Sequence, residues 1–297
     1  MSGKEVEADV CCANCGMAGV DDIKLENCDG CDLVKYCSDK CREEHREQHD
    51  EDCKNRGQEL HNDDLFTQPD GSHLGECPIC FLPIPLHPTK STFKSCCSEL
   101  ICNGCVVANL KSSGGLDRCP FCREPAPYDM EEYDKRQMKR IKANDPAAIR
   151  EMGARRHEEG DYDTAFEYYT KAAELGDAAA HYQLGYMYYS GEGVEKDEEK
   201  RVYHWEKAAI GGHPYARHNL ACYEKDNGNM ERVVKHLIIA SNLGLETSMK
   251  ELWKHYSLGN ITKEDLEVTL RTHHAAINGM KSPEREAAEA WLQSRDV

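Results

Sequence analysis

The sequence lacks any long hydrophobic run. No stretch approaches the roughly 18 consecutive apolar residues that a membrane-spanning helix requires. The first ten residues, MSGKEVEADV, contain neither the apolar core nor the small-residue cleavage site of a secretory signal. We therefore expect an intracellular protein of the cytoplasm or nucleus, in a reducing compartment and with no membrane partner.

Positive charge is also scarce. Lys and Arg number 37 against 54 Asp and Glu, which gives a formal net charge of −17. Such a surface repels the phosphates of nucleic acid unless a basic patch is segregated. The most basic run, KRQMKRIK at 135–142, lies beside DMEEYD at 129–134 and is typical of a solvated helix face. Nucleic acid is therefore not an expected partner.

Familiar catalytic motifs are missing as well, whereas cysteine is abundant. No phosphate-binding glycine loop, Ser-His-Asp set or paired-carboxylate site stands out. Of the 17 cysteines, 16 lie within residues 11–53 and 77–123. Without a secretory route, clustered cysteines are more typical of metal ligands than of disulfides.

Composition divides the chain into cysteine-rich and helical parts. Residues 54–76 are polar and contain Pro69, Gly71 and Gly75, which is typical of a linker. From Asp145 onward the chain is rich in Ala, Leu, Tyr and Glu with helical periodicity. The predicted organisation is a flexible tail (1–10), a first zinc module (11–53), the linker (54–76), a second zinc module (77–123), a linker helix (124–144), helical repeats (145–280) and a capping helix or tail (281–297).

The helical part repeats itself. KAAELG at 171–176 recurs as KAAIGG at 207–212 and, more weakly, as IASNLG at 239–244. Small residues let paired helices approach, large ones fill the groove beside them, and glycines suit the turns. This pattern predicts an α-solenoid. The positions in register are Ala172, Ala208 and Ala240; Gly176, Gly212 and Gly244; Ala180, Ala216 and Ser248; Leu184, Leu220 and Leu252; and the large Tyr169, Trp205 and Leu237.

One repeat carries a family resemblance. AAAHYQLGYMYYSGEGVEKDEEKRVYHWEKAAIGG at 178–212 resembles a Sel-one-like repeat. EEGDYDTAFEYYTKAAELG at 158–176 is equally similar to a tetratricopeptide repeat, and residues 245–279 are degenerate. The resemblance implies a surface for binding proteins or a scaffold, not chemistry. The aromatic residues of this part are expected to pack in its core: Tyr168, Tyr169, Tyr188 and Trp205.

The first cysteine-rich segment pairs its candidate ligands at short spacing. Pairs two or three residues apart can turn two side chains toward one metal, and Zn²⁺ takes four ligands in a tetrahedron. Eight candidates therefore predict two zinc sites. They are Cys12, Cys15, Cys28, Cys31, Cys37, Cys41, His49 and Cys53.

The end of this segment, YCSDKCREEHREQHDEDC at 36–53, resembles a MYND zinc finger. The family's interleaved wiring implies one zinc on Cys12, Cys15, Cys37 and Cys41, and another on Cys28, Cys31, His49 and Cys53. His45 is expected at the surface or behind the ligands, because the His-x3-Cys spacing puts His49 and Cys53 on one helix face. Cys11 is the expected spare, although its exchange with Cys12 stays open.

MYND fingers bind short proline-containing peptides, and the resemblance implies such partners here. The family often carries Gln and a His-Trp pair in its final helix. This chain has Arg42 and the pair His45-Arg46 in those places. The resemblance therefore implies a changed peptide groove beside intact zinc sites.

The second cysteine-rich segment contains CPIC at 77–80, an adjacent pair Cys96–Cys97, Cys102-x2-Cys105 and CPFCR at 119–123. Eight cysteines again predict two metal sites, so four Zn²⁺ are expected per chain. CPIC and CPFCR resemble a RING finger. Its cross-brace implies one zinc on Cys77, Cys80, Cys102 and Cys105, and another on Cys96, Cys97, Cys119 and Cys122.

The usual RING histidine is absent from the middle pair, where Cys97 and Glu99 stand. Cys96 is the predicted replacement ligand, and His87 or Glu99 stay open as alternatives. Neither cysteine-rich segment has enough apolar residues to fold without metal, so zinc binding supplies folding free energy. The expected fold is two small α+β zinc modules followed by an all-α superhelical solenoid.

A RING finger recruits a ubiquitin-charged conjugating enzyme and positions its thioester for attack by a lysine, without a covalent intermediate. The resemblance implies that Ile79 and Pro120 contact that enzyme, and that Arg123 contacts both enzyme and ubiquitin. The helix after Cys105 often carries a tryptophan in this family, whereas this one reads VVANLKSSGG at 106–115. Two hypotheses follow: a RING-type ubiquitin ligase that selects substrates through its other modules, or a non-catalytic adaptor.

Overall fold

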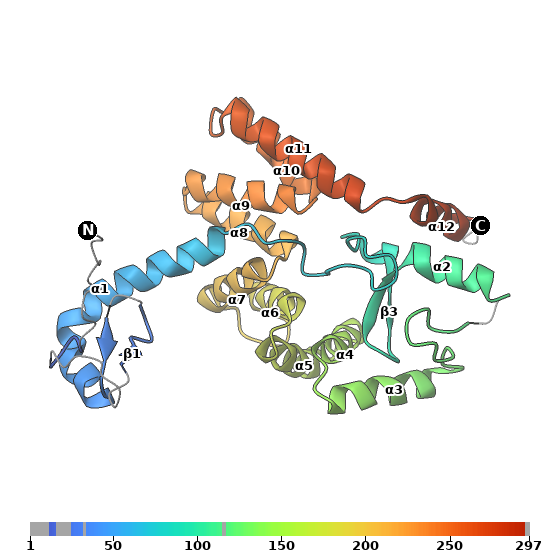
Figure 1. Cartoon of the computed structure of the whole chain (residues 1–297), viewed down its shortest axis with the longest axis horizontal. Helices are drawn as coiled ribbons and strands as arrows, with labels where there is room; N and C mark the ends of the chain where they lie inside the picture. Colours follow the sequence, from blue (N-terminus) through green and yellow to red (C-terminus); the bar gives the residue numbers. More distant parts are fainter. Residues whose placement is uncertain (1–11, 16–24, 32–33, 115–116, 295–297) are drawn as a thin grey trace, which may run out of the picture. The chain divides into compact units, whose positions relative to one another are not determined.

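The computed structural model describes residues 12–15, 25–31, 34–114 and 117–294 (Figure 1). The chain divides into two compact units, residues 1–67 and 68–297. Cys11 and the predicted tail at 1–10 lie outside the described residues. Within the described ranges, no helix is both long enough and apolar enough to cross a bilayer.

The first unit is a two-stranded antiparallel sheet beside one long helix. Strand β1 (Glu26–Asn27) pairs with β2 (Lys35–Tyr36). Helix α1 (Asp39–Phe66) begins at Ser38, whose side-chain oxygen accepts a hydrogen bond from the Cys41 N–H at 3.3 Å. This cap fixes the start of the helix that carries three of the predicted ligands, Cys41, His49 and Cys53.

The predicted linker at 54–76 is shorter in the structure, because helix α1 includes its first part. The helix continues through residue 66, so only residues 68–76 connect the two modules as irregular chain. Residues 54–66 are polar but contain no proline and only Gly57 as a helix breaker. Polarity does not oppose a helix made of Lys, Arg, Gln, Glu and Leu, which all have good helix propensity.

The second unit begins with the second cysteine module (residues 77–123). A 3-10 turn, η1 (Pro88–Lys90), leads into the hairpin of β3 (Ser91–Lys94) and β4 (Glu99–Cys102). The hairpin is antiparallel, with Lys94 opposite Glu99. Helix α2 (Asn103–Ser112) follows directly. The small buried core of the module contains Ile84 and Ile101 together with the cysteines Cys77, Cys102 and Cys119.

The rest of the second unit is helical. Helices α4 with α5, α6 with α7, and α8 with α9 pack as consecutive antiparallel pairs, and α10 and α11 pack on α9 (Figure 1). The helices are α3 (Met130–Lys142), α4 (Pro146–Glu158), α5 (Tyr162–Glu174), α6 (Ala178–Ser190), α7 (Glu198–Ile210), α8 (Pro214–Asp226), α9 (Met230–Asn242), α10 (Glu246–Ser257), α11 (Lys263–Gly279) and α12 (Pro283–Gln293).

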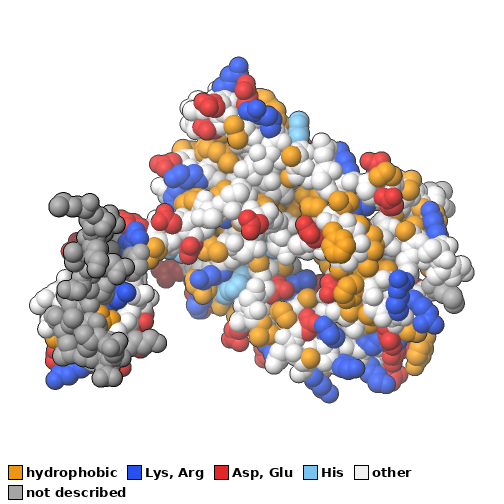
Figure 2. Space-filling model, in the orientation of Figure 1, with side chains coloured by type: hydrophobic (Ala, Val, Ile, Leu, Met, Phe, Trp, Pro, Cys, Tyr) orange, Lys and Arg blue, Asp and Glu red, His pale blue; other side chains and the backbone are white. Residues whose placement is uncertain are grey.

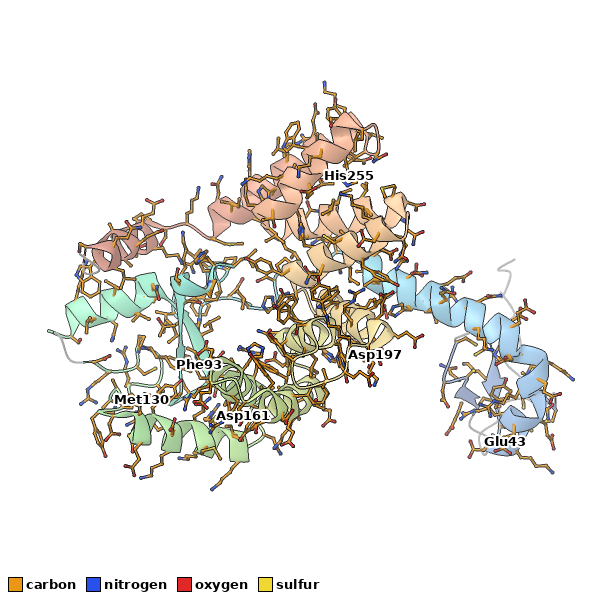
Figure 3. The ribbon with its side chains drawn as sticks, turned by 180° about the vertical axis from the view of Figure 1, so that it is seen from behind. Glu43, Phe93, Met130, Asp161, Asp197 and His255 are labelled. Carbon is orange, nitrogen blue, oxygen red and sulfur yellow. The ribbon has the colours of Figure 1, made fainter. Side chains whose placement is uncertain are left out.

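Local sequence explains where these helices begin and end. Asp161 and Asp197, labelled in Figure 3, cap α5 and α7 through side-chain oxygens that accept backbone N–H groups. The predicted turn glycines Gly176, Gly212 and Gly244 all have positive φ, of 87°, 80° and 90°. Glycine adopts this left-handed conformation without strain, so each helix can end sharply before the next begins.

The predicted repeat register is confirmed by burial. The small residues of the register are completely buried, the leucines are at most 1% exposed, and Tyr169, Trp205 and Leu237 are at most 5% exposed. Each ring also meets a small residue of the preceding helix. A Cβ on Gly153 would lie 2.9 Å from the Tyr169 ring, and one on Gly185 would overlap the Trp205 indole. The structure thus adds two glycines to the alanines that sequence periodicity identified.

Two segments tie the second cysteine module to the helical repeats. Residues 281–297 were predicted to form a capping helix or tail after the repeats. The structure has the helix α12 there, and it packs along α2 of the cysteine module. The other segment, residues 68–76, docks through His73, whose N–H donates to the Gly212 carbonyl at 3.0 Å. The His73 ring stacks on His213 at 3.9 Å, and His213 stacks on Tyr182. Residues 68–76 therefore form a strap across the repeats, not a free linker.

Candidate metal centres

The described residues bring 16 side chains together in four groups of four. Within each group the ligand atoms lie within 4.8 Å of one another. We name the groups after their first members: the Cys12 cluster (Cys12, Cys15, Cys37, Cys41), the Cys28 cluster (Cys28, Cys31, His49, Cys53), the Cys77 cluster (Cys77, Cys80, Cys102, Cys105) and the Cys96 cluster (Cys96, Cys97, Cys119, Cys122). All 16 predicted ligands fall in these clusters, in the predicted groupings.

The spacing of the sulfur atoms fits zinc. A tetrahedral Zn²⁺ with Zn–S bonds of about 2.3 Å places its sulfurs roughly 3.8 Å apart. The Sγ atoms of Cys15 and Cys37 are 3.6 Å apart, and those of Cys80 and Cys102 are 3.8 Å apart. A disulfide would need about 2.05 Å. Because soft thiolates and imidazole are the donors that zinc prefers, both donor set and geometry fit this metal.

Histidine enters one cluster only among the described residues. His49 is buried, and its Nε2 lies 3.2 Å from the Sγ of Cys31. His45 is one helical turn earlier and stays outside the cluster. Its ring stacks on His49 with centroids 5.7 Å apart, and its Nδ1 is 3.1 Å from the Tyr36 hydroxyl. His45 therefore lies behind the ligand His49 and contacts its ring, as the sequence predicts.

The adjacent cysteines Cys96 and Cys97 lie at the tip of the β3–β4 hairpin. The turn closes where the Ser98 N–H donates to the Lys94 carbonyl at 2.8 Å, with Ser98 at a φ of 60°. This left-handed residue reverses the chain directly after the pair, so both sulfurs face the same site. The Sγ of Cys96 is 3.4 Å from that of Cys122, and the Sγ of Cys97 is 3.8 Å from that of Cys119.

The alternatives to Cys96 lie elsewhere. His87 caps the 3-10 turn η1, where its Nδ1 is 2.8 Å from the Thr89 hydroxyl. Glu99 pairs with Lys94 in the hairpin. Neither residue belongs to a group of potential metal ligands among the described residues.

The loops at Cys77–Cys80 and Cys119–Cys122 of the second module have the same backbone. In each loop the carbonyl of the first cysteine accepts a hydrogen bond from the N–H of the residue four positions later, Phe81 or Arg123. The N–H of the first cysteine donates to the carbonyl of the residue five positions later, Leu82 or Glu124. The residues after the second cysteine, Phe81 and Arg123, both have positive φ, of 57° and 65°. Such loops aim backbone N–H groups at the first sulfur of the pair.

Those N–H groups favour the thiolate form of the first cysteine in each loop. Burial alone raises the pKa of Cys77, but backbone N–H groups of Cys80, Cys102 and Ile79 outweigh it and bring the pKa to about 7. In the same way, N–H groups of Cys15 and Cys37 outweigh burial and bring the pKa of Cys12 to about 6. Thiolate is the form that binds metal.

In two other cysteines of these clusters the pKa shifts in the opposite direction. Burial and hydrogen bonding to Cys28 raise the pKa of Cys53 to about 12, and burial with nearby Cys119 raises the pKa of Cys97 to about 12. Several thiolates cannot be confined together without a cation. A divalent metal at each centre removes this repulsion, which couples metal binding to folding.

The residues predicted to contact a conjugating enzyme differ in exposure. Ile79 is 38% exposed, Arg123 is exposed and Pro120 is buried. The Arg123 guanidinium donates to the side-chain oxygen of Asn109 in α2 at 3.2 Å. Sequence reasoning missed Phe81 and Phe121, which are 70% and 45% exposed in the two loops. Large apolar residues next to zinc-binding cysteines were the available signal.

Two known families match separate parts of this chain. The MYND finger matches residues 12–53, and the Sel1 repeat matches residues 146–177 and 178–213. The putative beta-lactamase HcpC of Helicobacter pylori is 38% identical over 56 residues, which are 19% of this chain and 19% of that protein.

Two solved structures are also similar. The Sel1 repeat protein from Oxalobacter formigenes is 29% identical with a TM-score of 0.44, over 50% of this chain and 65% of that one. The protective antigen c5321 of uropathogenic Escherichia coli, described as displaying an SLR fold, is 20% identical with a TM-score of 0.44, over 58% and 37%. Each match covers less than two thirds of the relative. The chain thus carries a MYND finger at residues 12–53 and Sel1 repeats at residues 146–177 and 178–213, with the second cysteine module between them in sequence.

Proposed function

We propose that this zinc-binding protein is a RING-type ubiquitin ligase of the cytoplasm or nucleus. The second cysteine module recruits the conjugating enzyme with its ubiquitin, and the MYND finger and Sel1 repeats bind substrates. The observation that carries the proposal is the cross-braced pairing of the cysteines, in which the Cys77 and Cys96 clusters alternate along the chain. Protein interaction by the MYND finger and Sel1 repeats is the part that the family matches support.

Exposed side chains of the two loops supply the docking contacts in this proposal. Ile79 and Phe81 lie in the first loop and Phe121 lies in the second, all with substantial exposed area. Arg123 follows the last cysteine, and its planar guanidinium can donate to carbonyl groups on two proteins at once. Catalysis is positional: the bound thioester is held so that a lysine of the substrate can attack.

A non-catalytic adaptor is the second candidate, and two observations favour it. Pro120 is buried, so it does not offer the enzyme contact that the RING resemblance implies. The Arg123 side chain is already hydrogen-bonded to Asn109. In this alternative all three modules bind proteins, including proline-containing peptides at the MYND finger, and no ubiquitin is transferred.

Self-ubiquitination by the zinc-loaded full chain separates the two candidates. With a ligase, ubiquitin conjugates form with at least one member of a broad panel of conjugating enzymes. Arg123→Ala should lower the rate about tenfold or more, because a hydrogen bond from a charged group is worth roughly 1.5–3 kcal/mol. Ile79→Ala should lower it about tenfold, because burying an isoleucine side chain against the enzyme is worth roughly 1.5–3 kcal/mol. Val268→Ala removes another exposed apolar side chain, in α11, and should leave the rate unchanged. Absence of conjugates across the whole panel would leave the adaptor.

A further inference from the structure

Arg285 of the C-terminal helix α12 reaches the first loop of the second cysteine module. Its Nη1 donates to the Pro83 carbonyl at 2.7 Å, and its Nη2 donates to the Leu82 carbonyl at 3.1 Å. The same Nη2 lies 3.4 Å from the Sγ of Cys80 and donates to it. A residue some two hundred positions away in sequence thus contacts a metal ligand directly.

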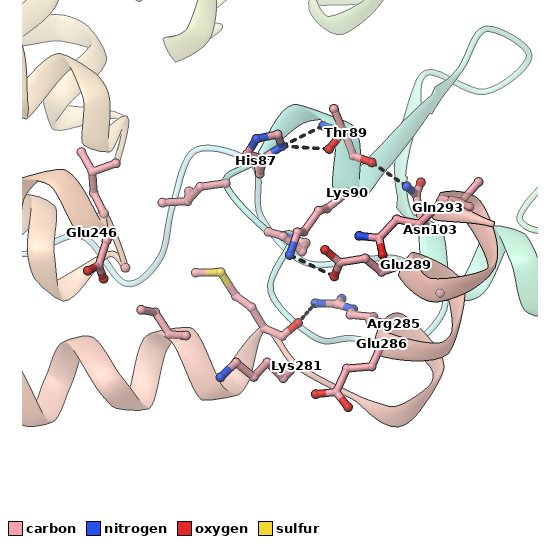
Figure 4. Close-up of a pocket in the computed structure, with 18 of the residues that line it drawn as sticks. His87, Thr89, Lys90, Asn103, Glu246, Lys281, Arg285, Glu286, Glu289 and Gln293 are labelled. Carbon is pink, nitrogen blue, oxygen red and sulfur yellow. Dashed lines mark hydrogen bonds and ion pairs between the residues drawn. The ribbon is translucent and has the colours of Figure 1, made fainter. Parts of the chain in front are cut away.

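The sequence of α2 permits this approach. Gly104 stands between the ligands Cys102 and Cys105, and a Cβ there would lie 2.9–3.1 Å from the side chain and backbone of Arg285. Further along α12, Glu289 forms an ion pair with Lys90 of η1 at 3.1 Å, as Figure 4 shows. The Lys111 ammonium lies 5.9 Å from the centre of the Trp291 ring. Several contacts therefore dock helix α12. Among those just described, the contact of Arg285 is the one that includes a cysteine sulfur.

The chemistry of the Cys77 cluster explains what a guanidinium does there. Four thiolates around one Zn²⁺ carry a double negative charge, which is costly in a cluster whose Cys77 and Cys102 are completely buried. A charge-assisted hydrogen bond to a thiolate offsets part of that charge and fixes the direction of the sulfur. Groups that hold metal ligands from behind typically change metal affinity 10- to 100-fold when they are removed.

We propose that Arg285 is a positioning residue of the Cys77 zinc site, and that it links zinc retention at this site to the docking of α12. The inference rests on the zinc of the proposed function being bound by this cluster. Helix α12 also forms one wall of a cavity of about 680 Å³, lined by Arg285, Glu286 and Glu289 on this side. Figure 2 shows apolar side chains gathered on the face of the second unit beside this helix. A change in zinc occupancy would therefore also change this cavity.

The release of zinc to a chromogenic chelator tests the proposal on the full chain. Arg285→Ala should release one zinc ion about 10- to 100-fold faster than the unchanged protein, and Arg285→Lys should restore part of the retention. Lys90→Ala and Trp291→Ala each remove one contact of α12 that involves no cysteine and leave the hydrogen bonds of Arg285 in place, so both should keep the original rate. Equal acceleration by all three alanine variants, or no acceleration by Arg285→Ala, would overturn the proposal.

Cobalt substitution provides a readout that does not depend on release. In the Co²⁺-loaded chain, Arg285→Ala should shift the thiolate-to-cobalt charge-transfer band, because the Cys80 sulfur loses a hydrogen bond. Unchanged bands would contradict direct action on the sulfur. A total count of two zinc ions in the unchanged protein would instead mean that the second module binds no zinc. That result would contradict the proposed ligase function as well. A count of four with unaltered release from Arg285→Ala would overturn only the role of Arg285.

Discussion

Single glycines set the distance between paired helices of the repeats. Gly185 faces the buried Trp205 indole, and a Cβ at this position would overlap the ring. Gly185→Ala should therefore lower the free energy of unfolding by about 1–3 kcal/mol, the usual cost of overpacking a core. Urea unfolding followed by far-ultraviolet circular dichroism measures this loss.

Gly279 supplies the matched control for that variant. It lies in α11, and a Cβ there would have no neighbour within 4 Å. Gly279→Ala should change stability by less than about 0.5 kcal/mol in the destabilising direction. If Gly185→Ala were as stable as Gly279→Ala, the close approach of helices α6 and α7 would not depend on this glycine.

Cys96 offers a test of the adjacent-cysteine site. Because its sulfur lies with those of Cys97, Cys119 and Cys122, Cys96→Ser should remove one zinc ion from the expected four. Cys222→Ser is the control, since Cys222 lies in α8 outside every cluster. Zinc content per chain, measured by atomic emission, reads out both variants. If the unchanged protein held about three zinc ions and Cys96→Ser held the same number, the Cys96 cluster would not bind zinc.

For individual residues, the sequence predicted which side chains lie together in clusters and in the core. It did not predict the backbone conformations that bring them together. Ligand spacing and repeat register depend on regular periodicity, so the clusters and the buried Trp205 could be predicted. The left-handed Ser98 could not, since serine has no preference that reveals positive φ. The contact of Arg285 with Cys80 was equally hidden, because nothing in the local sequence of α12 points to a distant loop.

At the scale of elements, the strap at 68–76 was predicted as a linker because of its proline and glycines. Those residues do stop helix α1, but they say nothing about what the extended chain touches. Its docking includes the His73 imidazole, which stacks on His213, the residue that caps α8, and the His73 N–H, which donates to the Gly212 carbonyl. Docking of this kind is a tertiary contact, which local composition does not encode.

The strap should make the stability of the protein depend on pH. Burial, with a smaller effect of Arg150, lowers the pKa of His73 from 6.5 to about 4, and burial also lowers the pKa of His213. A folded-state pKa below the unfolded value means that the unfolded chain binds more protons between these two values. Stability contributed by neutral His73 is therefore complete above about pH 6.5 and declines as the pH falls toward 4.

His73→Phe keeps a flat ring in the stack and removes the titration. Between about pH 7 and pH 5.5, the unchanged protein should lose roughly 1 kcal/mol more of its unfolding free energy than His73→Phe does. Urea unfolding at the two pH values measures the difference. The exposed His274 serves as control, because His274→Phe should leave the pH dependence as it was. Equal pH dependence in all three proteins would show that the strap does not carry this effect.

At the scale of the whole molecule, the two zinc modules have different positions in the folding of the chain. The MYND finger belongs to a compact unit of its own, whereas the second cysteine module shares a unit with the repeats. Arg140 of α3 donates to the Cys97 carbonyl and the Ser98 hydroxyl, both at 3.1 Å. Together with Arg285 and His73, it joins metal-binding loops to helices, so folding of the second module and of the repeats should be coupled.

Paired cysteine variants test this coupling. Cys77→Ser with Cys80→Ser removes the zinc of the Cys77 cluster, which should release the contacts of Arg285 and lower the melting temperature of the repeats. A loss of roughly 2 kcal/mol corresponds to about 4–8 °C for a unit of this size. Cys28→Ser with Cys31→Ser removes the zinc of the Cys28 cluster in the MYND finger and should leave that melting temperature unchanged. Differential scanning calorimetry of the zinc-loaded variants measures both. Equal shifts in the two variants would contradict the division into units, and no shift in either would contradict the coupling of zinc in the second module to the stability of the repeats.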